Sequence, residues 1–521
     1  MGDIKDFRFD NEVIFKGFWA LNPEDLLDSN FKVSNKAIPG NLELSKGRIT
    51  LDLNGNFKIH ILNNKNNNAV INRIYGFLYN GLYVVLENCI NIGRNSCSNG
   101  YTVEEHLISS LYTLNVDPKT AISKDEFNIM ANRVNFNINS LDQWYDVERA
   151  DITLKKEESK IIETHSNKFY DENEFSILND TFFISFKRNL FLGYKETIGS
   201  EVTYEPYISI STKNYQQYDI ETFKGIANWI FKLINFLTHT YGKYVTFEYF
   251  NENEINNRRV EIKDNGDYIY HNANYIGRLV FPQINIKEFE LDYKSIKLSK
   301  IKDKCGKLIA KWFENREKLE YIIDLYLQNL ASNLALETDL INQIIILETY
   351  YDNFLAGKSE EIDDNDKKLE EIKQKIKNFI DDPATAPSVR EEIIKSLDKK
   401  SNKNSTLREK LTVLLQNLPN ELSDGLTRVD ASWKNDNEFI EKYAERLKDT
   451  RNFYTHGANK KRNKKRFKTF EEAMSANKVL DYIIFYYIIK ALDTFDDEWI
   501  LNLPFFRWII YRAHKNTHKE Q

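Results

Sequence analysis

The main change in the spacing of the apolar residues of this chain falls near residue 310. Before that point they alternate with polar residues in many segments, a pattern typical of half-buried β-strands. The clearest alternation runs through Leu42, Leu44, Ile49, Leu51 and Leu53. After residue 310 apolar residues recur every three or four positions, as in Leu319, Ile322, Ile323 and Tyr326, which is typical of amphipathic helices. We therefore predict an α+β protein in which a β-rich region, residues 1–310, precedes an all-α helical bundle, residues 311–521.

The β-rich region contains both strand signals and one strong helix signal. Residues Asn41–Leu62 predict a three-stranded meander with turns at Ser45-Lys46-Gly47 and Asn54-Gly55, because Asn-Gly suits a two-residue hairpin turn. A helical stripe then runs from Phe223 to Leu237 and ends at Tyr241-Gly242. This change of period divides the region into two candidate subdomains near residue 220.

The helical region carries a charged segment at about 357–410. It contains Pro383 and Pro387, and we expect exposed helices there, inserted into the bundle and separated by a kinked break. Downstream, Phe439, Tyr443, Leu447 and Tyr454 have near-helical spacing. Residues Val479–Leu492 predict a last apolar helix.

Composition limits the classes of function. Lys and Arg number 72 against 78 Asp and Glu, a net charge of -6, so any nucleic-acid site must be a local basic patch. The three cysteines, Cys89, Cys97 and Cys305, form no C-x-x-C pair and fit a reducing compartment. The N-terminus shows no signal-peptide pattern, and the apolar runs are too short to span a bilayer. We expect a cytoplasmic protein with no membrane partner.

One short motif combines residues suited to phosphate chemistry: Arg451-Asn452-Phe453-Tyr454-Thr455-His456-Gly457. Asn452 and His456 are four residues apart and share a helix face, whereas Arg451 and His456 lie about 140° apart. Arg451 must therefore bend round, or meet the histidine of a second copy. Gly457 suits the position after a helix end, so His456 falls in the last turn, where the helix dipole favours a protonated imidazole. The alternative is that Arg451 and His456 are ordinary helix-end cations.

A dense basic run follows the motif at once. Its cations are Lys460, Lys461, Arg462, Lys464, Lys465, Arg466 and Lys468. Such clusters supply sequence-independent affinity for phosphate backbones, and Phe467 within the run could stack on a base. We predict RNA binding here; the alternative is a solvated loop.

Two further patterns do not predict sites. Gly357-Lys358-Ser359 lacks the earlier glycine of a phosphate-binding loop. The acidic clusters Asp363–Asp366 and Asp496–Glu498 lack a partner histidine or the glycine of a calcium-binding loop, so no metal site is predicted.

The chain resembles ApeA-like HEPN proteins. In the C-terminal region the resemblance rests on Leu347-Glu348-Thr349-Tyr350-Tyr351 and on the R-x4-H pattern of the motif Arg451–Gly457. In the N-terminal region it rests on Phe15-Lys16-Gly17-Phe18-Trp19 and on the stretch Pro39–Leu51, punctuated by glycines. The charged segment after Gly357 departs from a compact HEPN domain.

The resemblance implies a bacterial anti-phage protein that halts growth of the infected cell by cutting RNA. His456 would be the general acid/base, Arg451 would bind the scissile phosphate, and Asn452 would hydrogen-bond the phosphate or orient the histidine. Glu348 would help to pack or orient the site. The implied enzyme is metal-independent and needs no cofactor, leaves a 2′,3′-cyclic phosphate, and pairs two domains in a homodimer or higher homo-oligomer.

An enzyme of this kind must be kept inactive until infection, so we expect the N-terminal region to sense an infection cue or restrain the nuclease, with a phage-derived trigger as a candidate partner. The alternative function is a non-catalytic HEPN module that dimerises and binds RNA or a protein. The two differ in what they need: the enzyme requires Arg451 and His456, whereas the binding module requires only Lys460–Lys468.

Overall fold

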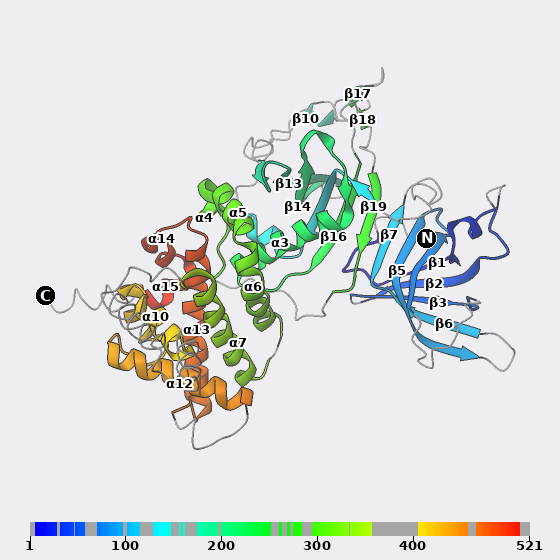
Figure 1. The fold of residues 1–521 in the computed structure, drawn as a ribbon. Coiled ribbons are helices and arrows are strands. Elements are labelled where there is room, and N and C mark those ends of the chain that lie inside the picture. The colour runs from blue at the N-terminus through cyan, green and yellow to red at the C-terminus, as the bar shows by residue number, and fades with distance from the viewer. Residues whose placement is uncertain are drawn as a thin grey trace, which may run out of the picture. The chain divides into compact units, whose positions relative to one another are not determined.

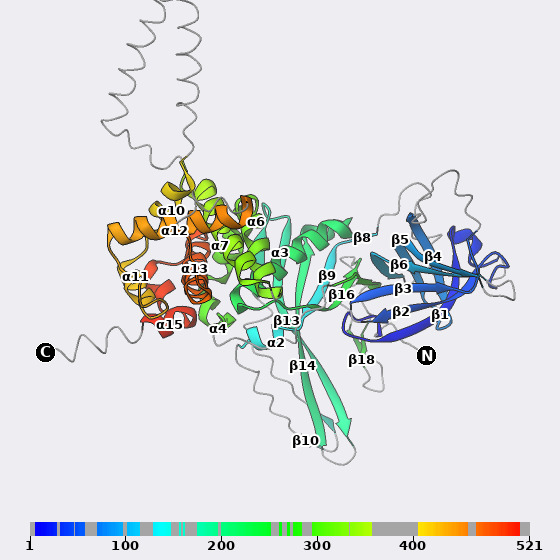
Figure 2. The ribbon, with the colours of Figure 1, turned by 90° about the horizontal axis from the view of Figure 1, so that it is seen from below.

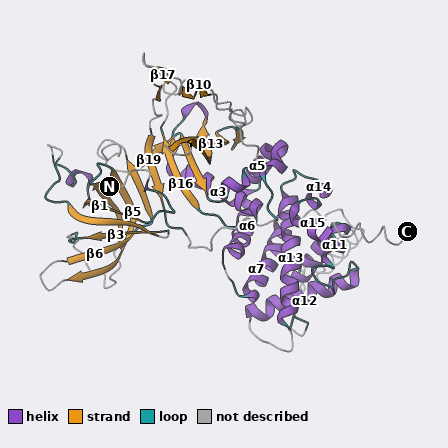
Figure 3. Cartoon of the chain, turned by 180° about the vertical axis from the view of Figure 1, so that it is seen from behind, coloured by secondary structure: helices purple, strands orange, loops and turns teal. Residues whose placement is uncertain are grey.

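The protein is described from a computed structural model, and it divides into two compact units, Met1–Phe313 and Glu314–Gln521. Strands dominate the first unit and helices the second, which confirms the predicted fold class (Figure 3). The described residues are 6–28, 32–45, 47–57, 70–96, 102–114, 129–146, 156–157, 160–161, 174–195, 199–251, 260–262, 268–270, 275–283, 294–332, 334–356, 405–456 and 465–510. Each unit is considered by itself.

Six antiparallel strands of the first unit form a closed ring. The strands are β1 (Val13–Ala20), β2 (Ile38–Ser45), β3 (Arg48–Leu53), β4 (Val70–Leu78), β5 (Tyr83–Ser96) and β6 (Thr102–Leu107). The neighbours in the ring are β4-β1-β2-β3-β6, and β5 pairs with both β4 and β6, which closes it (Figure 1). The predicted alternation in β2 and β3 is confirmed, because Leu42 pairs with Leu51 and Leu44 with Ile49.

Trp19 explains why glycines punctuate this region. Its side chain is fully buried, and its ring occupies the space where side chains at Gly40 and Gly76 would stand. A Cβ at Gly40 would lie 2.5 Å from the carbonyl oxygen of Asp52, and one at Gly76 would lie 2.3 Å from the Trp19 ring. Glycine is therefore required at both positions by close approach.

β5 continues the sheet beyond the ring through β7 (Ser110–Leu114). The remaining strands follow in the order β19 (Tyr275–Val280), β16 (Tyr244–Phe250), β9 (Arg133–Ile138), β14 (Gly199–Thr212), β13 (Phe182–Lys195) and β12 (Phe175–Ile177). β13 and β14 form the long hairpin seen in Figure 2. Short pairs lie outside this sheet: β8 (Met130–Ala131) with β15 (Tyr218–Asp219), β10 (Lys156–Glu157) with β11 (Lys160–Ile161), and β17 (Val260–Ile262) with β18 (Tyr268–Tyr270).

The apolar face of this second part of the sheet is covered by α3 (Ile220–Thr238). Asp219 caps the helix by accepting a hydrogen bond from the Thr222 amide at 2.8 Å. Phe231 of α3 stacks on Tyr244 of β16, with ring centroids 4.6 Å apart. Short helices complete the unit: α2 (Leu141–Trp144), α4 (Leu298–Ile301) and α5 (Cys305–Glu314).

α5 is attached to α3 by a pair of tryptophans. The rings of Trp229 and Trp312 stack with centroids 4.6 Å apart. Each indole N–H donates to the backbone carbonyl of the other tryptophan, at 3.1 and 2.9 Å. Both buried indoles are thus satisfied, so the pair contributes apolar burial at no hydrogen-bonding cost.

Two predictions for this unit were wrong in detail. The third strand of the predicted meander cannot pair with β3, because β6 occupies the second edge of β3; residues 58–62 themselves lie outside the described part. The helix α3 ends at Thr238, before the predicted stop at Tyr241-Gly242. His239 adopts the left-handed conformation (φ 51°) that terminates the helix, a position where glycine was expected.

The second unit is a helical bundle arranged around α7 (Leu336–Phe354), which contacts α6 (Arg316–Ala331), α10 (Leu407–Gln416), α12 (Asn437–His456) and α13 (Phe470–Ala491). Leu340, Ile344 and Leu347 of α7 are fully buried, as their spacing predicted. The bundle is completed by α11 (Asn420–Leu426), α14 (Asp497–Leu501) and α15 (Pro504–Ile510). The apolar helix predicted to be the last, at Val479–Leu492, is therefore followed by two more helices. Most of the predicted insertion at 357–410 lies outside the described residues.

Candidate active site

α12 carries the motif on a helix that is anchored along its whole length. The Asp436 side chain accepts a hydrogen bond from the Phe439 amide at 2.7 Å, which satisfies the start of the helix. Tyr443, Ala444 and Leu447 form its buried face. The helix ends at His456, the position expected from Gly457. The His456 side chain lies outside the described part of the chain.

Arg451 points toward α7, where it meets Glu348. Its Nη2 lies 3.7 Å from the Glu348 Oε2, an ion pair too long to be a direct hydrogen bond. The Arg451 side chain is 27% exposed, and its Nε is buried with no hydrogen-bond partner among the described residues. A buried guanidinium donor without a partner is uncommon in folded proteins.

Lys410 of α10 joins the same group of charges. Its ammonium lies 2.6 Å from Asp352 Oδ2 and 3.7 Å from Glu348 Oε1, and only 10% of its side chain is exposed. Three helices, α7, α10 and α12, therefore bring together two cations and two carboxylates. We call Glu348, Asp352, Lys410 and Arg451 the charge cluster. Its two signs balance, and Glu348 links Lys410 to Arg451.

Asn452 follows Arg451 on α12. Its side chain is half-buried and forms no hydrogen bond with the described residues. Since α12 is helical to its last residue, positions 452 and 456 fall on the same side of the helix. Thr455 lies between them in sequence, and its hydroxyl donates to the Arg451 carbonyl at 2.7 Å, which holds this last turn.

The chain returns to α12 just after the undescribed residues 457–464. Asp449 is 4% exposed, and its carboxylate accepts from the Lys465 amide at 3.2 Å. The fully buried Thr450 accepts from the Phe467 amide at 3.1 Å. The end of the basic run, at Lys465 and Phe467, is therefore attached to the last two turns of the motif helix.

Phe467 is not a base-stacking ring, which corrects our prediction. It is 3% exposed, packs edge-on against Tyr443 at 5.5 Å between ring centroids, and lies under the Arg446 guanidinium at 4.2 Å. The hydrogen bond from its backbone amide to the Thr450 hydroxyl holds this part of the chain against the core. Arg446 also pairs with Glu472 at 2.7 Å. Burial alone would raise the pKa of the Glu472 carboxyl. Hydrogen bonds from the Lys468 amide and the Arg446 side chain outweigh burial, so the pKa of Glu472 is lowered.

Three cations of the basic run lie in the described part. The Lys465 ammonium is 2.6 Å from Glu445 Oε2, and this hydrogen bond lowers the pKa of Glu445. The Arg466 guanidinium lies 4.1 Å from the centroid of the Phe453 ring, a cation–π contact. Lys468 is exposed. Lys460, Lys461, Arg462 and Lys464 lie outside the described residues.

Comparison with known families adds a second observation to this geometry. The sequence pattern of the family described as Apea-like HEPN matches residues 341–498. The pattern described as ApeA N-terminal domain 1 matches residues 14–312, more than half of the chain. The chain belongs to the ApeA-like HEPN family of anti-phage proteins. The HEPN match contains the whole charge cluster, the motif and the basic run.

No curated protein and no solved structure matches this chain. The ApeA N-terminal match begins within β1 and ends within α5, so it covers the closed ring and the second part of the sheet together. Among the described residues, no helix is both long enough and apolar enough to cross a membrane.

Lys410 and Asp352 are site residues that the sequence reasoning missed. The charged segment was assigned to an insertion up to about residue 410, which hid the start of α10. A signal was present, because Thr406 and Glu409 form a capping box in which each side chain bonds the other's backbone amide. Leu411, Leu414 and Leu415 follow with helical spacing. These residues place a buried helix directly after the cap, and Lys410 at its inward side.

Proposed function

We propose that this ApeA-like HEPN protein is a metal-independent endoribonuclease that protects bacteria by abortive infection. The observation that carries the proposal is Arg451: its side chain is 27% exposed, and its Nη2 lies 3.7 Å from Glu348, which orients a guanidinium that stays partly accessible. Such a group can bind a phosphate oxygen without first being ordered, and it stands on the helix that ends at His456.

The reaction follows from the chemistry of these side chains. The imidazole of His456 accepts the proton of the RNA 2′-hydroxyl, whose oxygen attacks the adjacent phosphorus. The bond from phosphorus to the 5′-oxygen breaks, and that oxygen takes a proton from a protonated imidazole. The products are a 2′,3′-cyclic phosphate and a free 5′-hydroxyl, with no net consumption of water or metal.

Arg451 stabilises the extra negative charge on the phosphate in the transition state, and Asn452 hydrogen-bonds the phosphate or orients His456. Glu348 is a positioning residue, since it contacts Arg451 and Lys410 and not the substrate. One acid and one base are needed at the same moment. HEPN domains commonly dimerise, so we propose a homodimer in which the motifs of two copies supply both.

The basic run would hold the RNA backbone in this account. The run supplies a dense local positive charge on an acidic chain, from Lys460, Lys461, Arg462, Lys464, Lys465, Arg466 and Lys468. Replacing Lys460, Lys461 and Lys464 with alanine should weaken RNA binding and reduce its dependence on salt. Unchanged binding would remove this segment from the RNA site.

We further propose the following division of labour. Residues 1–310 sense an infection cue or restrain the nuclease, 311–521 form the nuclease, and the segment at about 357–410 is an insertion within it. The protein would act in the cytoplasm, where its RNA substrate is, and a phage-derived molecule would be the trigger. Both infection sensing and RNA cleavage can be tested in the same cells.

The test is phage challenge of bacteria that express the wild type, His456→Ala, Arg451→Ala or the control Lys442→Ala, with total RNA sized alongside. Lys442 is an exposed residue of the same helix, and its ion pair is with Glu438 one turn away. We expect the wild type and Lys442→Ala to protect and to fragment RNA, and the two motif variants to do neither. If folded His456→Ala protects as well as the wild type, the protein is a binding module and the nuclease assignment is wrong.

A further inference from the structure

The second part of the N-terminal sheet has one apolar face and one polar face, and the polar face is not covered by α3. The alternation along β9 separates them: Val134, Phe136 and Ile138 are buried, while Arg133 and Asn135 alternate with them on the opposite face. On β14, Ser209 and Ser211 pair with Asn135 and Arg133 and so share the polar face. Residues opposite one another in antiparallel strands point to the same side.

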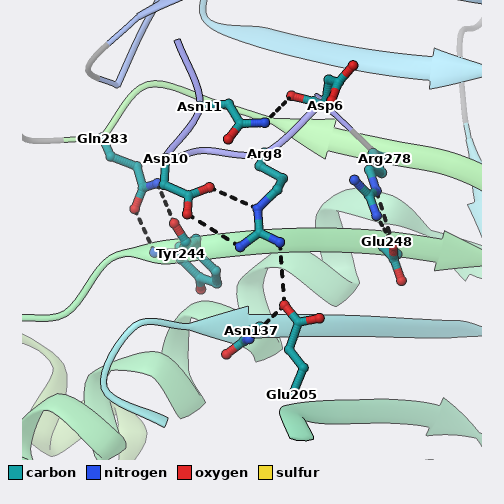
Figure 4. Close-up of polar contacts among 10 residues, drawn as sticks. All are labelled: Asp6, Arg8, Asp10, Asn11, Asn137, Glu205, Tyr244, Glu248, Arg278 and Gln283. Atoms are coloured by element: carbon teal, nitrogen blue, oxygen red, sulfur yellow. Dashed lines mark hydrogen bonds and ion pairs between the residues drawn. The ribbon is translucent and has the colours of Figure 1, made fainter. Parts of the chain in front are cut away.

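At one end of this face, cations are matched by carboxylates (Figure 4). Arg8 pairs with Asp10 at 3.0 Å and lies 3.5 Å from Glu205 Oε1, which also accepts a hydrogen bond from Asn137. Arg278 of β19 pairs with Glu248 of β16 at 2.6 Å. These pairs explain the charges here as internal contacts of the sheet.

The other end of the face is different, because it is hollowed into a polar cleft of about 480 Å³. Three cations line it, Arg133, Lys187 and Lys213, against one carboxylate, Glu174. The ammonium groups of Lys187 and Lys213 form no ion pair with the described residues. Among the described residues of the lining, cations therefore outnumber carboxylates, on a protein that is acidic as a whole.

Hydroxyls and rings complete the lining. Ser209 and Ser211 bring hydroxyl-bearing side chains to the lining, and Phe183 and Tyr215 bring aromatic ones. Charged donors combined with hydroxyls suit a phosphate group, while aromatic rings can stack on a base. A cleft of this volume falls within the range of small-molecule sites.

The loop at the mouth of the cleft is held in a strained conformation. Asn214 and Tyr215 adopt successive left-handed backbone conformations, with φ of 53° and 57°. Such conformations cost about 1–3 kcal/mol each for residues other than glycine and persist where neighbours enforce them. Here Asn132 donates to the Tyr215 carbonyl at 3.3 Å, and Thr212 donates to the Gln216 carbonyl at 2.6 Å. All of Asn132, Thr212, Asn214 and Tyr215 line the cleft.

We propose that this cleft is a second ligand site, which binds a nucleoside phosphate of mononucleotide size. The phosphate lies against Arg133, Lys187 and Lys213, and the base lies against Phe183 or Tyr215. The site is separate from the charge cluster, because all its residues belong to the N-terminal unit. It therefore does not depend on the proposed nuclease activity.

The test is calorimetric titration of the full-length protein with AMP, GMP, CMP and UMP, one at a time, beside inorganic phosphate and the four uncharged nucleosides. We expect at least one monophosphate to bind saturably and more tightly than both inorganic phosphate and its own nucleoside. Lys213→Glu and Lys187→Glu should each weaken that binding by at least about tenfold, the loss expected for one charged hydrogen bond. The matched control is Lys16→Glu, an exposed lysine of β1 outside the cleft, which should bind like the wild type.

His456→Ala and Arg451→Ala separate this site from the motif helix. Nucleotide binding that survives in both, and is lost in Lys213→Glu, belongs to the cleft. The proposal is overturned if no monophosphate binds, if binding is lost in the motif variants and kept in Lys213→Glu, or if inorganic phosphate or a nucleoside alone binds as tightly as the monophosphate.

Discussion

The two units of this protein arrange their charged residues in opposite ways. In the helical unit, Arg451 and Lys410 share Glu348, so each site cation has a carboxylate within 4 Å. In the β-rich unit, the polar cleft gathers three cations around one carboxylate, while the core beneath is held by apolar packing. The first arrangement fixes the direction of a guanidinium, which suits catalysis. The second leaves net charge to attract an anion, which suits binding.

The largest expected effect tests the packing side of this comparison. Trp312→Ala removes one of the two stacked indoles, leaves a cavity, and takes away the indole N–H that donates to the Trp229 backbone carbonyl. We expect the free energy of unfolding to fall by about 4 kcal/mol, measured by urea denaturation of the full-length protein. Tyr79→Ala is the control, because Tyr79 is 51% exposed, and it should change the stability by less than about 0.5 kcal/mol. Equal losses in the two variants would contradict the role given to the tryptophan pair.

The charge side is tested next by Lys410→Met, which keeps the length of the side chain and removes its charge. Glu348 and Asp352 would lose their shared cation, so we expect a loss of about 2 kcal/mol in the free energy of unfolding. Lys442→Met, on an exposed ion pair, should leave the free energy of unfolding nearly unchanged. A Lys410→Met protein as stable as the wild type would mean that the charge cluster is not held by its internal pairing.

Glu348→Gln asks whether the pairing serves the reaction. The amide retains the shape and loses the charge that holds Arg451. We expect kcat for RNA cleavage to fall about tenfold with KM and the melting temperature unchanged, because a misdirected guanidinium weakens the transition state more than it weakens RNA binding. A change in KM alone, or in the melting temperature alone, would show that Glu348 acts on RNA binding or on folding and not on the direction of Arg451.

The smallest expected effect concerns pH. The pKa values of Glu445 and Glu472 lie below their usual value of 4.5 in the folded protein. The stability that these carboxylates contribute is therefore present above pH 4.5 and is lost as the pH falls through the lowered folded-state pKa. Thermal melts at pH 7 and at pH 4 should show a smaller acid-induced loss in Glu445→Gln and Glu472→Gln than in the wild type. An identical loss in all three proteins would remove these two groups from the explanation.

The fold class could be predicted because apolar residues recur at every second position in the strands and at every third or fourth position in the helices. The strands β2 and β3 and the helices α7 and α12 follow directly from that pattern. The closure of the ring could not be predicted, since it depends on pairing β6 with both β3 and β5, and pairing between distant strands leaves no mark in local spacing. For the same reason, β6 displaced the expected third strand of the meander.

The candidate site was predictable only along one helix. Arg451, Asn452 and His456 lie within six residues of each other and carry a recognisable spacing, and Glu348 came from the resemblance. Lys410 lies far from them in sequence and meets them only through the packing of α10 on α7. The burial of Phe467 could not be predicted either. It depends on a hydrogen bond from the Phe467 backbone amide to the buried Thr450 hydroxyl, which leaves no mark in the composition.

The measurement that tests the central claim most directly is cleavage of total bacterial RNA by purified protein in the presence of EDTA, with the chemistry of the new 3′ ends determined. The account predicts fragments that end in 2′,3′-cyclic phosphates with the wild type and with Lys442→Ala. It predicts loss of that activity by about 10²–10⁴-fold with His456→Ala at unchanged RNA affinity. A folded His456→Ala protein that cuts at the wild-type rate, or a wild type that cuts only when a divalent metal is restored, would contradict it.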